Sequence, residues 1–122
     1  MMLPAGKKVL QMEIEFISSK LLRIFNEEQL LMKTYGAERS KKIKMRIASL
    51  LTATTLEDMR NVPGRCHELT GNLAGKLAID LDGPYRLIFE PANIPLPIRE
   101  DGGLDWKLVT SVRIREVKDY HG

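Results

Sequence analysis

The hydrophobic pattern of the chain changes near residue 65, from a helical period to an alternating one. Between residues 21 and 51, apolar side chains recur every three or four positions, which is the spacing of amphipathic helices. From residue 65 onward, apolar and polar residues alternate, which is the pattern of half-buried strands. The chain is therefore expected to be an α+β protein with the order β-α-α-β-β-β, whose helices cover one face of a small, mainly antiparallel sheet.

The boundaries of the elements follow from this pattern and from the residues that interrupt it. No linker or repeat divides the sequence, so residues 1–122 are expected to form one domain. The helices are expected at 21–35, with a bend near Asn26, and at 37–51, with Gly36 as the cap between them. The strands are expected at residues 8–17, 65–69, 77–82, 85–90 and 106–118.

The strand region contains one clear hairpin and one long loop. Asp82-Gly83 is a strong hairpin signal, whereas the prolines and glycines of residues 91–104 are incompatible with a central strand. Alternation leaves Arg86, and Arg113 or Arg115, on the face that the helices do not cover. The opposite face is expected to supply the core, together with the helices, through Phe16, Phe25, Ile47, Leu77, Ile79, Leu87, Phe89 and Val112.

The charge of the chain is concentrated in its second helix. The net charge of +3 is a weak indication of a polyanionic partner. Five basic residues and no acidic one lie between Arg39 and Arg46, and Arg39, Lys42 and Arg46 share one face of the helix. Such a face is either simply solvated or able to contact phosphates, and the sequence leaves both interpretations open.

Cysteine content and hydropathy indicate a cytoplasmic protein. The single cysteine, Cys66, cannot form an internal disulfide, which fits a reducing compartment. No apolar run approaches the roughly 20 residues that a membrane-spanning helix needs. Cys66 and His67 are neighbours in an expected strand, so they point to opposite faces and cannot easily share a metal ion. We therefore expect no metal site and no cofactor, and we expect Cys66 to be a small buried residue.

RNA cleavage by attack of the ribose 2′-OH needs neither a metal ion nor a cofactor. The protein must remove one proton, supply another and stabilise the extra negative charge on phosphorus. His67, Tyr120 and His121 carry groups able to transfer protons, and Arg86 is suited to binding a phosphate. The alternative is structural: the last twelve residues would form an edge strand with a solvated polar end.

Three segments together resemble the HigB-type branch of the RelE toxins. They are the R-x-H-x-L-x-G turn within Arg65–Gly75, the tyrosine–arginine strand within Asp80–Glu90, and the terminal Asp119-Tyr120-His121. The resemblance extends over residues 65–121 and includes the helical half only in its layout. It implies a RelE-like fold and the toxin of a type II toxin–antitoxin pair, which would be a ribosome-dependent mRNA endonuclease acting in the A site. The implied partners are the ribosome, mRNA and a cognate helix-turn-helix antitoxin.

The resemblance also implies site residues. Positions used for catalysis or mRNA contact in such toxins correspond to His67, Arg86, Asp119, Tyr120 and His121. These toxins often have a lysine where this chain has Thr70, so one phosphate-binding cation is missing from the turn. Lys76, Arg65 or Arg113 could replace it. Together with the basic helix, these residues form the expected RNA- and ribosome-binding set of Arg39, Lys42, Arg46, Arg65, Lys76 and Arg113. The loop at 91–104 is longer than the usual link in these toxins.

Two other functions are compatible with the same fold. ParE-type toxins use it to poison DNA gyrase, an activity that does not need His67 or the terminal Asp-Tyr-His. A ribosome- or RNA-binding module without catalysis would need only the basic helix. His67 and the terminal Asp-Tyr-His disfavour the gyrase poison, whereas the binding module, in which the histidines would be incidental, stays open.

Overall fold

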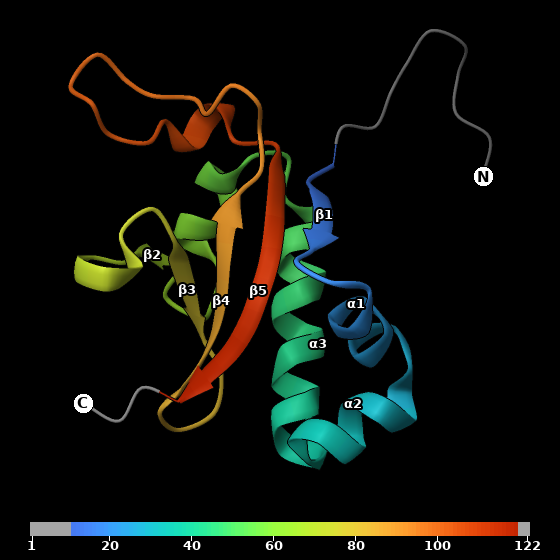
Figure 1. Cartoon of the computed structure of the whole chain (residues 1–122). Coiled ribbons are helices and arrows are strands. Elements are labelled where there is room, and N and C mark those ends of the chain that lie inside the picture. The colour runs from blue at the N-terminus through green and yellow to red at the C-terminus, as the bar shows by residue number, and fades with distance from the viewer. Residues whose placement is uncertain (1–10, 120–122) are drawn as a thin grey trace, which may run out of the picture.

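The computed structural model describes residues 11–119, and in this part of the chain three helices pack on one face of a five-stranded sheet (Figure 1). The helices are α1 (Ser19–Asn26), α2 (Glu28–Tyr35) and α3 (Ala37–Thr52). The strands are β1 (Glu13–Phe16), β2 (His67–Glu68), β3 (Leu77–Asp80), β4 (Tyr85–Pro91) and β5 (Ser111–Asp119). Short 3-10 turns lie at Leu56–Asn61, Gly71–Leu73 and Trp106–Leu108.

The sheet combines strands from both halves of the chain, in the order β1-β5-β4-β3-β2. Strands β2 to β5 pair antiparallel, whereas β1 pairs with β5 in parallel. The expected α+β class and the mainly antiparallel sheet are therefore confirmed. The parallel pair places the first and last strands side by side. The long loop between β4 and β5 extends past one end of the sheet (Figure 1).

The helical region contains three helices where two were expected. The helix expected at 21–35 divides at Glu27, whose extended backbone (φ −109°, ψ 113°) ends α1 and precedes α2. Ser18 caps α1 by accepting the backbone N–H of Leu21 at 3.1 Å. Gly36 separates α2 from α3 with φ at +84°, which glycine adopts without a Cβ clash. No helix within residues 11–119 is long and apolar enough to cross a membrane.

The last strand begins at Ser111, so the expectation that it begins at Trp106 was wrong. Asp105 accepts the backbone N–H of Lys107 at 3.2 Å and starts a 3-10 turn. This turn places Trp106 in the core, where Arg60 stacks on the indole ring at 3.9 Å and Glu68 accepts the indole N–H at 3.0 Å. Because Trp106 is fixed by these contacts, strand alternation begins only after the turn.

The core lies between the sheet and the helices. Its fully buried members include Leu77, Ile79, Leu87, Phe89 and Val112 from the sheet, as expected, and Leu31, Ile43 and Leu50 from the helices. Phe16, Phe25 and Ile47 pack against this core but are only partly buried, which corrects the expectation for these three. They line a groove between α1, α3 and β1 that is open to solvent, because β1 is an edge strand that the short helices cover incompletely.

Replacing Phe89 by Ala is expected to lower the free energy of unfolding by about 3–5 kcal/mol. Phe89 is fully buried, and it lies between Leu77 of β3 and Ile114 of β5. Urea denaturation at neutral pH would measure the loss. Phe25→Ala is the matched control. That ring is only partly buried, so its removal should lower the free energy of unfolding by clearly less. Equal losses for the two variants would contradict this description of the core.

Candidate functional site

The sheet face opposite the helices, called here the open face, carries both His67 and Arg86. In one row across the sheet, His67 pairs with Ala78 and Ala78 pairs with Ile88. Two residues further along β3, Asp80 pairs with Arg86. Since residues two apart in a strand share a face, His67, Asp80 and Arg86 all lie on the open face. They adjoin a hollow of about 240 Å³ lined by Arg65, His67, Leu69, Ala78 and Arg86.

Arg86 is held in place by three acceptors. Its Nε lies 2.8 Å from a carboxylate oxygen of Asp80, and its Nη1 donates to the carbonyl oxygens of Gly83 and Tyr85 at 3.1 and 3.0 Å. A guanidinium has five N–H groups, so the two on Nη2 have no acceptor among residues 11–119. This edge of Arg86 is the part of the guanidinium able to bind a phosphate.

Asp80 joins Arg86 to Arg65. The Nε and Nη2 atoms of Arg65 contact the two carboxylate oxygens of Asp80 at 3.2 and 3.3 Å. The backbone of Arg65 has φ at +51°, a conformation that non-glycine residues adopt at a cost. The site thus contains two arginines and one carboxylate, which leaves a net positive charge beside the hollow.

The imidazole of His67 is oriented by the backbone of Arg65. Its Nδ1 lies 2.7 Å from the carbonyl oxygen of Arg65. A carbonyl oxygen only accepts hydrogen bonds, so Nδ1 must carry the proton in this contact. In the neutral ring the lone pair is then on Nε2, which is the nitrogen able to accept a proton from a substrate.

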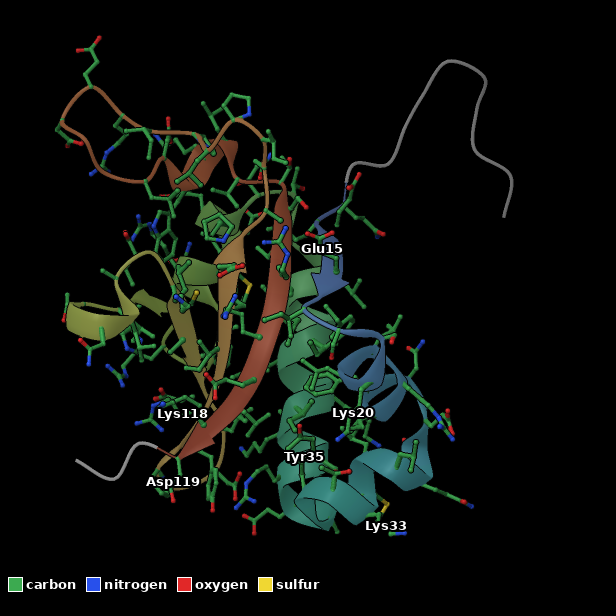
Figure 2. The ribbon with its side chains drawn as sticks, viewed as in Figure 1. Glu15, Lys20, Lys33, Tyr35, Lys118 and Asp119 are labelled. Carbon is green, nitrogen blue, oxygen red and sulfur yellow. The ribbon has the colours of Figure 1, made fainter. Side chains whose placement is uncertain are left out.

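Asp119 does not join this group, and the other two terminal candidates lie outside the described residues. Asp119 pairs with Tyr85 and Lys118 pairs with Arg86, at the end of β5 (Figure 2). Alternation therefore puts Lys118 on the open face and Asp119 on the helix side. Tyr120 and His121 follow Asp119 in the sequence, and their proposed roles stay predictions.

The expected basic face of the second helix is only partly present. The expectation that Arg46 lies on a solvated face was wrong, because the residue is 7% exposed and its Nε donates to the carbonyl oxygen of Asp80 at 2.9 Å. Arg39 binds both carboxylate oxygens of Asp82 at 3.1 and 3.2 Å, and it stacks on the Tyr85 ring. Both arginines connect α3 to the β3–β4 hairpin, which disfavours a role in binding phosphates.

Lys42 and Lys76 remain candidates for phosphate contact. Both are partly exposed, and neither ammonium group forms an ion pair with any residue in 11–119. Lys76 directly precedes β3, and its carbonyl oxygen accepts the backbone N–H of Leu69, which lines the hollow. Of the three proposed substitutes for the missing lysine, Arg65 lines the hollow but binds Asp80, and Lys76 has no carboxylate partner among residues 11–119.

Arg113 belongs to a separate network of charges on the open face. Its guanidinium contacts Glu90 at 2.8 Å and Glu15 of β1 at 2.6 Å, and Glu90 also accepts from Arg115 at 3.1 Å. Burial favours the protonated form of Glu90, but hydrogen bonds and charges of Arg113 and Arg115 outweigh it and lower the pKa of that carboxyl. Arg113 is thus already neutralised, which disfavours it as the substitute cation.

Replacing Glu90 by Gln is expected to destabilise the protein by about 1–3 kcal/mol at neutral pH. The folded-state pKa of Glu90 lies below its ordinary value of 4.5, so its contribution is complete above that pH and is lost as the pH falls through the folded-state value. The difference between the wild type and the variant should therefore shrink in acid, as measured by urea denaturation at several pH values. Glu15→Gln, at a carboxylate that is 53% exposed, is the control and should have a smaller effect. A difference independent of pH would contradict the assignment.

Cys66 is not positioned as a nucleophile. Burial raises the pKa of the Cys66 thiol to about 12. The positive charge of Arg60 lowers this pKa, and the negative charge of Glu68 raises it. Cys66 packs against the core but is only partly buried, which corrects the expectation that it is a buried residue. Within residues 11–119, no group of three or more His, Cys, Asp and Glu side chains is arranged to hold a metal ion.

Sequence reasoning missed the role of Asp80 and the structural role of Arg46. Arg46 is three residues after Ile43 and four before Leu50, both of which are buried, so its helical spacing already placed it in the apolar stripe. Asp80 had no such local signal, because its partners are 15 positions before it, at Arg65, and six positions after it, at Arg86.

Comparison with known proteins gives a likeness of fold. No protein-family model matches the sequence, and no curated protein matches it. Among solved structures, a chain of the YoeB-YefM complex from Staphylococcus aureus is similar, with a TM-score of 0.51 and 16% sequence identity. The match covers 92% of this chain and 99% of that chain. It extends through the helical half, which the sequence motifs did not include.

Proposed function

We propose that this chain is the toxin of a type II toxin–antitoxin module, which inhibits translation by cutting mRNA in the ribosomal A site. The observation that best supports the proposal is the grouping of Arg65, His67 and Arg86 around one hollow of the open face. A cationic edge and a proton acceptor within one small site are what 2′-OH attack on a phosphodiester requires. The HigB-like motifs of the sequence supply the same residues.

In the proposed reaction, His67 acts as the general base. Its Nε2 accepts the 2′-OH proton, the 2′ oxygen forms a bond to phosphorus, and the bond from phosphorus to the 5′ oxygen breaks. Free N–H groups of Arg86 bind the phosphate oxygens as negative charge accumulates there. The 5′ oxygen must receive a proton, and Tyr120 or His121 is the proposed donor. The products are a 2′,3′-cyclic phosphate and a 5′-hydroxyl, and no metal ion takes part.

The likeness of fold to a chain of the YoeB-YefM complex is compatible with this proposal. We propose that the partners are a cognate helix-turn-helix antitoxin, the ribosome and mRNA. We propose that Lys42, Lys76 and Arg65 contact RNA phosphates. Arg39, Arg46 and Arg113 instead bind acceptors within the same chain.

The test is translation of a defined mRNA in a purified system containing ribosomes and the protein. Cuts within codons, seen by primer extension and dependent on ribosomes, are the expected result. Stalling without cuts would instead indicate a binding module without catalysis. Linearised plasmid in a parallel reaction with DNA gyrase would indicate a ParE-like poison. Antitoxin binding is tested separately, by coexpression of the neighbouring open reading frame and co-purification.

A further inference from the structure

Asp80 contacts the site and the scaffold at the same time. Its backbone N–H donates to the carbonyl oxygen of Gly64 at 2.7 Å, and its own carbonyl oxygen accepts from Arg46 of α3 at 2.9 Å. The residue is thereby fixed between the segment that precedes β2 and the helical layer. Its carboxylate extends from the open face, where it binds both Arg65 and Arg86.

The segment just before His67 is fixed just as closely. A Cβ on Gly64 would lie 2.6 Å from the Ile79 side chain and 2.9 Å from Nε of Arg46, so only glycine fits there. The next residue, Arg65, is the single non-glycine residue within 11–119 with a positive φ. In this conformation its guanidinium contacts the Asp80 carboxylate at two points, 3.2 and 3.3 Å. The carbonyl oxygen of Arg65 then accepts a hydrogen bond from Nδ1–H of His67.

We infer that Asp80 is a positioning residue for this site. Its carboxylate directs the free N–H groups of Arg86 and Arg65 toward the hollow, and through the backbone of Arg65 it selects the His67 tautomer with the lone pair on Nε2. The part of this inference that concerns RNA cleavage rests on the proposed function. The part that concerns the His67 tautomer is independent of the proposed function.

The tautomer is measured by long-range proton–nitrogen NMR of the imidazole rings above pH 8, with His121→Gln used to assign the signals. In the wild type we expect the proton of His67 on Nδ1. In Asp80→Ala, the Arg65 guanidinium loses the carboxylate that it binds, and His67 should shift toward the Nε2–H form that free histidine prefers. Asp80→Asn keeps the side-chain volume if the alanine variant does not fold, and it should shift the tautomer in the same direction.

Asp82 offers a matched control two residues away. Its carboxylate also binds an arginine at two points, Arg39 at 3.1 and 3.2 Å, but it contacts neither Arg65 nor Arg86. Asp82→Ala should therefore leave the His67 tautomer unchanged. A wild-type tautomer in a folded Asp80 variant, or an equal change in Asp82→Ala, would overturn the inference.

Cleavage kinetics provide the second readout. Asp80→Asn should lower kcat by about 10²-fold, because the reacting groups lose their alignment. KM should stay equal or fall, since one negative charge beside the phosphate site has been removed. Asp80→Glu, which restores the charge, should recover part of kcat. A rise in KM at unchanged kcat would overturn the inference. If the wild type cuts no mRNA, the proposed function fails, and the tautomer measurement still decides the role of Asp80.

Discussion

His67→Ala is expected to lower the rate of ribosome-dependent mRNA cleavage by about 10²–10⁴-fold. The Nδ1 atom of His67 is committed to the Arg65 carbonyl oxygen at 2.7 Å, so the free nitrogen of the neutral ring is Nε2. Removing that nitrogen removes the proposed acceptor of the 2′-OH proton. The fold should be little affected, because His67 lies in a two-residue strand at the edge of the sheet and is not part of the core.

Two further substitutions separate the base from its hydrogen bond. His67→Asn keeps an N–H near the position of Nδ1 but has no counterpart of Nε2, so it should be as inactive as the alanine variant. Glu116→Ala is the control on the open face, at an exposed position of β5 in the row of Ala78 and Ile88. Single-turnover cleavage on programmed ribosomes is the measurement. Wild-type rates in both His67 variants would rule out His67 as the base.

Arg86→Ala is expected to lower the cleavage rate by about 10²–10³-fold, the loss typical when one donor to a developing negative charge is removed. The three fixed contacts of Arg86 leave only its Nη2 edge for the phosphate, so the group is oriented before substrate binds. Arg86→Lys should restore little activity, because an ammonium group cannot bind Asp80, the hairpin carbonyls and a phosphate together.

The control for Arg86 is Arg23→Ala on α1, where the arginine side chain is 70% exposed and, among residues 11–119, forms an ion pair only with Glu27. It should cleave mRNA at the wild-type rate. Because Arg86→Ala also loses structural hydrogen bonds, assays belong well below its melting temperature and at equal soluble concentrations. Undiminished cleavage by folded Arg86→Ala would remove the arginine from the reaction.

Local patterns were enough to predict much of the site. The alternation of Tyr85-Arg86-Leu87 placed Arg86 on the open face, and the same rule placed Phe89 in the core. Both predictions depend only on which way neighbouring side chains point, which the backbone geometry of a strand determines. Side-chain chemistry and the motif resemblance both named His67, but neither identified its position beside Arg86 in space.

Charged residues were harder to place than apolar ones. Arg39 and Arg46 were expected on an exposed basic face of the second helix, either solvated or binding phosphates, yet each has an acceptor on the β3–β4 hairpin. A buried charge is tolerated only when it is paired, and its partner is usually distant in sequence. The burial of Arg46 was visible in its helical spacing, but Asp80 as its acceptor was not.

The sequence by itself determined the order and approximate positions of the strands and of the helical region, which strand residues face the core, and which face carries Arg86, because these features follow from local periodicity. The tertiary structure alone decided that Asp80 binds Arg65 and Arg86, that Arg46 supports Asp80 from the helix side, and that Asp119 lies on the helix side of β5. Those outcomes depend on strand register and helix packing. Both are set by the combined free energy of many contacts between residues that are far apart in the chain.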